Sequence, residues 1–212
     1  MQREAFRRFE EMKTELRFAG FNVSEAILNA SNYQTPQNRE RLFVVGLNAE
    51  LFPNTFWSPP GPTTTDRATV TVRAALEGLA EPTHFARGLD PNAFPLHPNH
   101  WCMAPKSPKF TRPGALSPGR SGSRSFKTLA WDQPSFTVAF GNREVHIHPL
   151  CHRRLSVYEA MRLQGFPNDY VLLSTLSSQI TQISEAVPPP LAHAVAMSIQ
   201  ASIATEAEAA NV

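Results

Sequence analysis

The sequence has little of what would mark a secreted, zinc-binding or membrane protein. Among its 212 residues are only two cysteines, Cys102 and Cys151, and no Cys-x-x-Cys pair. This excludes a disulfide framework and a zinc site built from paired thiolates. No apolar run approaches the roughly 20 residues of a transmembrane helix, and the charged start MQREAFRRFEEMK lacks the apolar core of a signal peptide. We therefore expect a reduced, cytoplasmic protein without a membrane span.

The net charge is only +2, but the charges are unevenly distributed along the chain. Residues 100–154 hold nine basic residues against Asp132 and Glu144, an excess of seven positive charges. Such a local excess suits a polyanion such as nucleic acid, although a solvated basic loop would have the same composition. The basic residues are Lys106, Lys109, Arg112, Arg120, Arg124, Lys127, Arg143, Arg153 and Arg154.

The first 50 residues have the rhythm of an α/β sheet with outer helices. Apolar residues recur at helical spacing over 3–19 and end at Gly20, a residue typical of helix C-termini. The stretches FNVSEAIL (21–28) and RLFVVGL (41–47) predict strands, the second of them buried. We expect these residues to be the end of such a sheet, since no strand pattern precedes the first helix in this sequence.

From about 52 to 135 prolines are frequent and periodicity fades, so we expect loops and short strands, with one helix over 68–79. Strands are expected at 134–140 and 143–149. A helix is expected at 156–164, with Ser156 and Glu159 forming a capping box and an apolar face of Val157, Ala160, Met161 and Leu163. A last helix should span about 190–206, with prolines in its first turn.

The stretch NYQTPQNRERLFVVGL (32–47) places Gln37, Arg39 and Arg41 at alternating positions. On an extended backbone such side chains share one face. Guanidinium groups suit phosphate oxygens and base carbonyls because they offer paired donors that stay charged. A solvated strand end with chance arginines is the alternative.

Three stretches, in this order and spacing, resemble motifs of the DNA cytosine-5 methyltransferases. TPQNRERLFVVG (35–46) resembles motif VIII (Gln-x-Arg-x-Arg), RRLSVYEAMRLQGFPNDY (153–170) resembles motif IX, and TQISEAVPPPLAHAVA (181–196) resembles motif X. The irregular, basic region lies where that family has its variable target-recognition region, and PSFTV (134–138) before motif IX is similar to many members.

The resemblance implies the fold class: the C-terminal portion of a Rossmann-like, S-adenosylmethionine-dependent methyltransferase sheet plus a small, irregular, mainly β target-recognition domain. The expected domains are the end of the catalytic α/β domain (1–50), the target-recognition domain (51–150) and motifs IX and X (151–212). Double-stranded DNA is the implied partner.

The resemblance also implies roles for single residues. Arg41 would bind O2 of a flipped-out cytosine, Arg39 would make phosphate and scaffold contacts, and Gln37 would order the loop. Ser184, Glu185 and Ala186 would lie near S-adenosylmethionine, the methyl donor. Here the chain departs from the family, whose commoner text before Ala-Val-Pro-Pro is Gly-Asn rather than Ser184-Glu185.

The Pro-Cys nucleophile (motif IV), the Glu-Asn-Val motif (VI) and the glycine-rich cofactor turn (I) of the family do not occur in the sequence. Cys102 and Cys151 lie in other contexts and are expected to be structural, since nothing nearby lowers a thiol pKa. Alternating His146, His148 and His152 lack companion ligands, so we expect no metal.

Two hypotheses follow. The chain is the C-terminal half or subunit of a bacterial or phage cytosine-5 methyltransferase, probing DNA in the cytoplasm and inactive until a second polypeptide carrying motifs I to VI completes the shared cofactor pocket. Alternatively, it is a non-catalytic DNA-binding module or the inactive remnant of a truncated methyltransferase gene. An exposed sheet edge would favour the first, because such an edge needs a cover.

Overall fold

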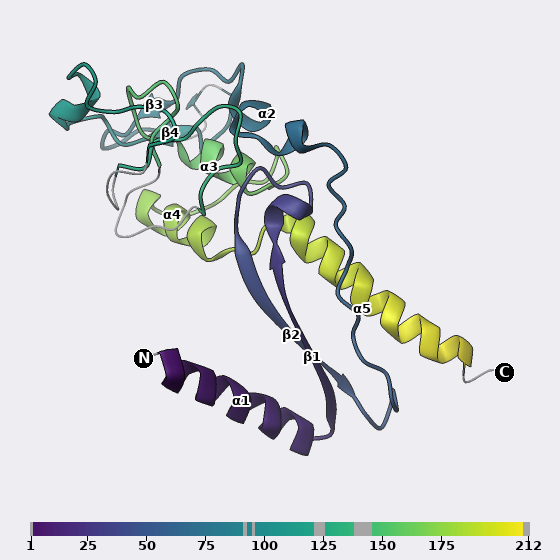
Figure 1. The fold of residues 1–212 in the computed structure, drawn as a ribbon. Coiled ribbons are helices and arrows are strands. Elements are labelled where there is room, and N and C mark those ends of the chain that lie inside the picture. Colours follow the sequence, from purple (N-terminus) through teal and green to yellow (C-terminus); the bar gives the residue numbers. More distant parts are fainter. Residues whose placement is uncertain (1, 91–92, 95, 121–125, 138–145, 210–212) are drawn as a thin grey trace. The chain divides into compact units, whose positions relative to one another are not determined.

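The computed structural model describes residues 2–90, 93–94, 96–120, 126–137 and 146–209 (Figure 1). The chain forms two compact units. Unit 1 contains residues 1–28, 40–62 and 192–212, and unit 2 contains residues 29–39 and 63–191.

Unit 1 is built on helix α1 (Gln2–Phe18), strands β1 (Phe21–Asn29) and β2 (Glu40–Asn48), and most of helix α5 (Pro189–Ala209). These elements confirm the helices and strands expected at both ends of the chain, but β2 is not a buried strand as expected, since Leu47 is buried while Leu42 is 49% exposed. Gly20 ends α1 with a φ of +90°, a conformation that glycine adopts without steric cost. β1 and β2 form a two-stranded sheet, and Trp57 packs on α5, where its Nε1 donates to Ser198 Oγ at 2.7 Å.

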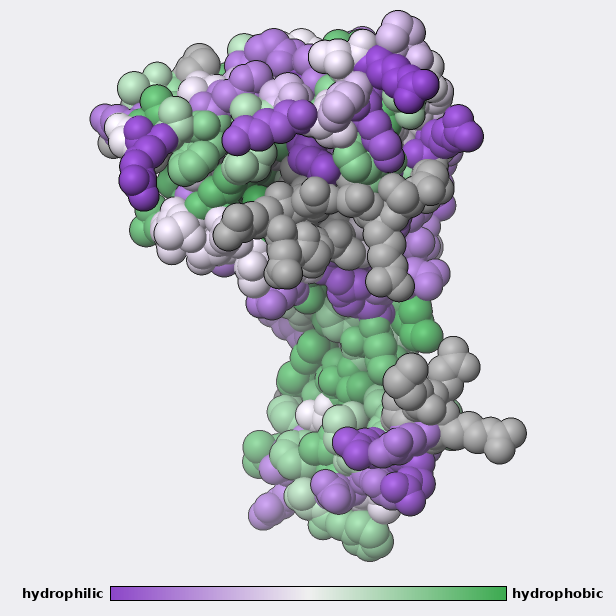
Figure 2. Space-filling view, turned by 90° about the vertical axis from the view of Figure 1, so that its left-hand side faces the viewer, coloured by the Kyte–Doolittle hydropathy of each residue, from purple (hydrophilic) through white to green (hydrophobic). Residues whose placement is uncertain are grey.

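The apolar residues of unit 1 are only partly covered. On α1, Phe6 is 66% exposed and Phe18 is 89% exposed, and Ile27 on β1 is 69% exposed. Figure 2 shows hydrophobic surface over α1 and the two strands, in the lower part of that view. Exposed apolar residues gathered in this way are typical of a surface that another polypeptide covers.

Unit 2 has its core around helix α3 (Val157–Leu163). The predicted apolar face is confirmed: Val157, Ala160, Met161 and Leu163 are at most 1% exposed. They pack with residues of helix α2 (Val72–Leu76), strand β4 (Trp101–Cys102) and helix α4 (Leu176–Glu185). Burying each of the larger side chains contributes about 1.5–3 kcal/mol, so α3 is the element around which this unit is held together.

The predicted capping box at the start of α3 is also confirmed. Ser156 Oγ accepts from the Glu159 backbone N–H at 3.0 Å, and Glu159 Oε2 accepts from the Ser156 N–H at 2.7 Å. At the other end, Gly165 has a φ of +74° and turns the chain out of the helix.

The helix expected over 68–79 is wrong as a single element. It consists of a 3-10 turn, η2 (Arg67–Val70), and the short α2, separated by Thr71 in extended conformation. The Thr71 hydroxyl accepts from the Ala74 N–H and so caps α2. Such side-chain bonds to the backbone compete with the backbone bonds that would continue the preceding helical turn. Helix α4 was not predicted, although Leu176, Ile180 and Ile183 have helical spacing.

Regular strands are sparse in the described part of unit 2. Strand β3 (Thr83–His84) pairs in parallel with β4, the turn η4 (Pro108–Phe110) follows, and isolated bridges join Gln37 to Ser135, Thr128 to Ile147 and Ile147 to Arg154. Of the strands expected at 134–140 and 143–149, the described residues 134–137 and 146–149 form only isolated bridges, at Ser135 and Ile147, and 138–145 lie outside the described residues. No described helix has the length and apolarity that crossing a membrane requires.

The contacts group the chain differently from the expected domains 1–50, 51–150 and 151–212. Residues 151–191 belong to the same unit as 63–150. Residues 29–39, which include the start of the motif VIII stretch, belong to it too. The reason is the α3-centred core, which draws on residues from 72 to 183.

Candidate functional site

The segment 36–39 is anchored inside unit 2. Gln37 and Arg39 are both 0% exposed. The Asn38 N–H donates to Ser135 O at 2.8 Å, and the Ser135 N–H donates to Pro36 O at 3.0 Å. Motif VIII is thereby paired, backbone to backbone, with the PSFTV segment.

Arg39 ties this loop to motif X. Its Nη2 donates to the backbone carbonyl of Ser184, 145 residues away. A guanidinium without solvent exposure that donates to a carbonyl is part of the scaffold rather than a contact for an external phosphate.

Among the described residues, neither amide atom of the Gln37 side chain has a hydrogen-bond partner, although both are buried. Ser135 Oγ, on the residue bridged to Gln37, also has none within the described ranges. Buried amides of this kind cost about 1–3 kcal/mol when unsatisfied. The amide of Gln37 and the hydroxyl of Ser135 are therefore able to form hydrogen bonds that the described residues do not supply.

Arg41 differs from Arg39. It lies near the start of β2 in unit 1 and is half-buried. Its Nη1 donates to the carbonyl of the adjacent Glu40 at 2.7 Å, the one contact recorded for its guanidinium among the described residues. Most of its donors remain available, which is what a group that binds an external acceptor needs.

Motifs IX and X also contact each other. Gln164, at the end of α3, is 0% exposed and its Nε2 donates to the carbonyl of Ile183 in α4. A Cβ on Gly165 would lie 2.9 Å from the ring of Pro190, so glycine is needed for this approach. The motif VIII segment up to Arg39, the motif IX segment and the start of the motif X segment therefore meet within unit 2.

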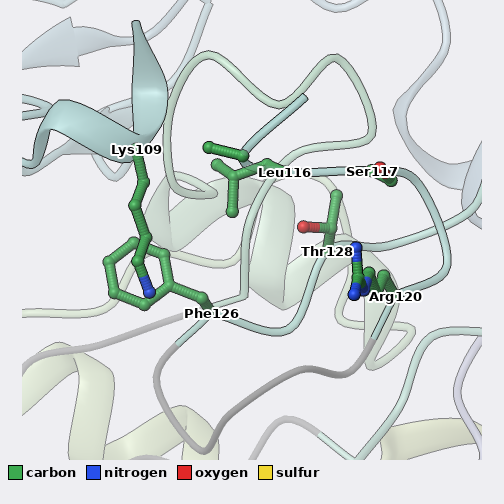
Figure 3. A pocket seen from close by; sticks show the side chains of 7 residues that line it. Lys109, Leu116, Ser117, Arg120, Phe126 and Thr128 are labelled. Carbon is green, nitrogen blue, oxygen red and sulfur yellow. The ribbon is translucent and has the colours of Figure 1, made fainter. Parts of the chain in front are cut away.

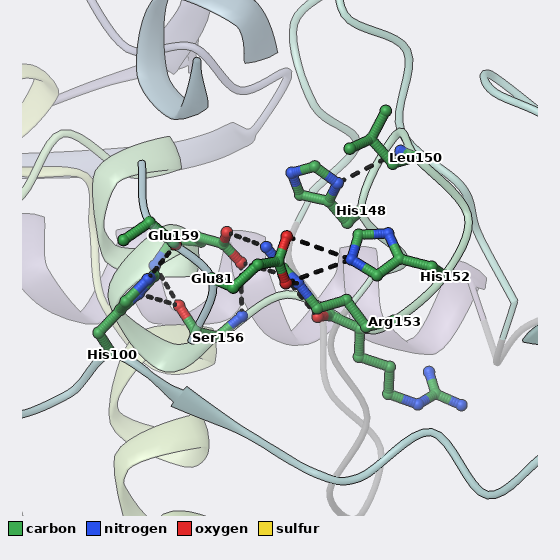
Figure 4. Close-up of polar contacts among 10 residues, drawn as sticks. Glu81, His100, His148, Leu150, His152, Arg153, Ser156 and Glu159 are labelled. Atoms are coloured by element: carbon green, nitrogen blue, oxygen red, sulfur yellow. Dashed lines mark hydrogen bonds and ion pairs between the residues drawn. The ribbon is translucent and has the colours of Figure 1, made fainter. Parts of the chain in front are cut away.

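Arg153 was expected to face DNA, and the structure gives it another role (Figure 4). It is 2% exposed, and its two terminal nitrogens donate to the Glu159 carboxylate at 2.9 Å each. Its Nε donates to Glu81 Oε2 at 2.6 Å, and His152 Nε2 lies 3.2 Å from the same carboxylate. The charge of Arg153 is thus neutralised inside the protein, which is a correction to its expected place in the DNA-binding set.

The ion pairs change the acidity of these groups. Although burial raises the pKa of Glu81, the hydrogen bonds from Arg153 and His152 outweigh it and bring the pKa to about 2. Burial lowers the pKa of Arg153, but the bonds to Glu159 and Glu81 outweigh it and leave the pKa raised. Glu81 was missed as a partner because it lies 72 residues before Arg153.

Arg154 is also largely buried, at 9% exposure, so direct contact with DNA is closed to most of its side chain. Its guanidinium carbon lies 5.1 Å from the centroid of the Phe126 ring and 6.0 Å from that of Phe110. The other described members of the basic set remain accessible: Lys106, Lys109, Arg112 and Arg120 are exposed, and Lys127 is half-buried. Arg124 and Arg143 lie outside the described residues.

Ser184, Glu185 and Ala186 lie at the C-terminal end of α4. Ser184 Oγ donates to Thr181 O at 2.9 Å, and the exposed Glu185 carboxylate has no contact recorded with the described residues. A carboxylate and a hydroxyl are acceptors that fit the ammonium and ribose hydroxyl groups of S-adenosylmethionine, so the residues present are compatible with one polar wall for that cofactor.

Neither cysteine is set up as a nucleophile. Cys102 is 2% exposed, and burial raises its pKa to about 12; burial also raises the pKa of Cys151. His146 and His148 are buried too, and burial lowers the pKa of each to about 4. Within the ranges that the structure describes, no three His, Cys, Asp or Glu side chains cluster as metal ligands.

Comparison with solved structures places the fold among methyltransferases. A proposed DNA modification methyltransferase encoded within an Escherichia coli prophage superposes with a TM-score of 0.74 at 19% identity, covering 94% of this chain and 66% of that one. The S. pombe Dnmt2 methyltransferase gives a TM-score of 0.54 at 16% identity, covering 90% and 59%.

Residues 1–201 match the family described as C-5 cytosine-specific DNA methylase, and the chain belongs to that family. It is 32% identical over 203 residues to the type II methyltransferase M.MthTI of Methanothermobacter thermautotrophicus, covering 85% of this chain and 57% of the relative. It is 29% identical over 208 residues to M.NmeDI of Neisseria meningitidis serogroup C, covering 91% and 49%. The chain spans about half the length of these curated relatives.

Proposed function

We propose that this chain is the target-recognition and pocket-completing part of a DNA (cytosine-5-)-methyltransferase. The observation that carries the proposal is that Arg39 of motif VIII and Gln164 of motif IX both bind the start of motif X in unit 2, at Ser184 and Ile183. Family membership and the type II methyltransferase relatives support it, including a role in DNA modification beside a restriction enzyme. Such an enzyme would act on double-stranded DNA in the cytoplasm of a bacterium or a phage-infected cell.

In this proposal Gln37, Arg39 and Arg41 of motif VIII have different roles. Arg41, with donors available, hydrogen-bonds O2 of a flipped-out cytosine and stabilises negative charge on the ring during attack. Arg39 fixes the loop against motif X. Gln37 supplies amide groups that find partners when the site is complete.

S-adenosylmethionine supplies the methyl group, and Ser184, Glu185 and Ala186 form one wall of its pocket. The cysteine nucleophile, the acidic group for the base and the glycine-rich turn are supplied by residues outside these 212, on a second polypeptide with motifs I to VI. The exposed apolar residues of unit 1, among them Phe6, Phe18 and Ile27, support such a partner, because they are a face that it would cover.

The test is reconstitution of methyl transfer. The chain alone should transfer no labelled methyl group from S-adenosylmethionine to DNA, and adding a polypeptide that carries motifs I to VI should restore transfer. In the restored enzyme Arg41→Ala should lower turnover by about 10²–10³-fold, as expected for losing one donor to a developing oxyanion, with much less effect on DNA binding.

The control is Arg87→Ala, which removes an exposed arginine of unit 2 and should leave turnover unchanged. Methyl transfer by the chain alone would overturn the assignment of the nucleophile to a partner. DNA binding without any restorable transfer would instead favour the non-catalytic DNA-binding module. Equal effects of the two arginine variants would remove the proposed role of Arg41.

A further inference from the structure

Unit 2 contains a pocket of about 220 Å³ between the turn η4 and the segments on either side of residues 121–125 (Figure 3). Lys109 and Arg120 bring a cation from opposite sides, and Thr128 lies between them. None of the described residues that line the pocket is acidic. A cavity smaller than the roughly 300–1,000 Å³ of a drug-sized ligand site suits a small anionic group.

The ring of Phe126 holds one of the two cations of this pocket. Lys109 Nζ lies 4.2 Å from the ring centroid, and the guanidinium carbon of Arg154, which does not line the pocket, lies 5.1 Å from it. Each such contact stabilises a cation by about 0.5–1 kcal/mol at an exposed site. A lysine is ordinarily flexible, so the ring holds its ammonium group at the wall of the pocket and lowers the entropy that binding an anion would cost.

The backbone fixes the opposite wall. The Thr128 N–H donates to Arg120 O at 3.2 Å, and the Gly119 N–H donates to Leu129 O at 3.3 Å. These two bonds fix the backbone from which the Arg120 side chain extends. Leu116 and Ala115 add an apolar surface beside the cations. This arrangement is complementary to a nucleotide of DNA, because the cations can bind the phosphodiester oxygens while the apolar surface contacts the adjoining deoxyribose.

We propose that this pocket binds one phosphodiester of the DNA strand, shared between Lys109 and Arg120, with Phe126 as a positioning residue and the sugar against Leu116. The proposal rests on the DNA role proposed above and adds a specific contact to it. Lys106 and Arg112, exposed and outside the pocket lining, would contact other phosphates.

The experiment measures how the affinity of the 212-residue chain for a short mixed-sequence duplex depends on salt, by fluorescence anisotropy between about 50 and 200 mM salt. Each phosphate neutralised contributes about 0.9 to the slope of log affinity against log salt. The Lys109→Gln/Arg120→Gln double variant should lose about 0.9 of slope, because the two cations share one phosphate. A loss of about 1.8 would mean two separate phosphates and would overturn the shared site.

Three comparisons define the outcome further. Arg87→Gln, which removes an exposed arginine of unit 2 outside the pocket, should leave the slope unchanged. Phe126→Leu should reduce the slope while Phe126→Tyr retains it, a difference that depends on the aromatic ring rather than on filling space. Sodium phosphate replacing chloride at equal ionic strength should not displace the duplex, and full displacement at low phosphate would assign the pocket to free phosphate.

The failures are distinguishable. A steep slope for the unaltered chain with no change in the double variant would overturn the pocket and leave the DNA role standing. A flat slope for the unaltered chain would overturn the DNA role itself.

Discussion

Replacing Glu159 by glutamine tests how much of unit 2 depends on the buried Arg153 pair. Arg153 and Glu159 are 2% and 1% exposed and share two hydrogen bonds of 2.9 Å. The change leaves a buried cation whose remaining carboxylate, Glu81, has a side chain that is 63% exposed. Removing one partner of a buried pair costs about 3–5 kcal/mol. We expect the free energy of unfolding to fall by about 3 kcal/mol, at the lower end of this range. Glu81 still pairs with Arg153, and the glutamine amide oxygen can still accept from the Ser156 N–H.

The measurement is urea unfolding followed by tryptophan fluorescence, to which Trp101 contributes from the same core. The matched control is Glu77→Gln, which removes a carboxylate from an ion pair with Arg73 at 2.9 Å whose side chains are 62% and 42% exposed. An exposed pair of this kind contributes less than about 1 kcal/mol. If the two variants lose the same stability, the reasoning from burial is refuted.

Two further changes probe other parts of unit 2. Because burial lowers the pKa of His146 and His148 to about 4 from 6.5, their neutral forms contribute stability that is fully present above pH 6.5 and is lost as pH falls through about 4. The loss should be on the order of 3 kcal/mol per histidine, measured by unfolding across that range, and a His146→Gln variant with an unchanged pH profile would contradict it. Gly165→Ala should cost about 1–3 kcal/mol more than Gly114→Ala in the same unfolding assay. Both glycines have positive φ, but only at Gly165 would the added Cβ meet Pro190 at 2.9 Å, so equal costs would refute the tight approach of motifs IX and X.

Local signals in the sequence predicted the helices and strands that depend on neighbouring residues. The capping box of Ser156 and Glu159 and the apolar spacing that follows them located α3, and Gly20 located the end of α1. The helix over 68–79 was wrong because Thr71 caps a new helix instead of continuing the first turn. The same kind of helical spacing, at Leu176, Ile180 and Ile183, is present in α4.

The environment of the charged residues could not be read from the sequence. Arg153 was counted with the DNA-binding cations because its partner Glu81 is 72 residues away and becomes a neighbour only through the fold. Arg39 and Arg41 look equivalent in the motif, yet the first is fully buried and the second keeps most donors available. The pocket at Phe126 also depends on tertiary contacts, since Lys109 and Arg120 reach it from opposite sides and Phe126 comes from a third segment.

The bond from Arg39 to motif X ends on a backbone oxygen, and so does the bond from Gln164. Every amino acid offers that oxygen, so the two bonds do not depend on which side chains stand at 183 and 184. This explains how Ser184-Glu185 can replace the family's commoner Gly-Asn while the motifs still meet. The side chains at 184 and 185, at the end of α4, can therefore vary without breaking the link between the motifs, whereas Ile183 is held in the core.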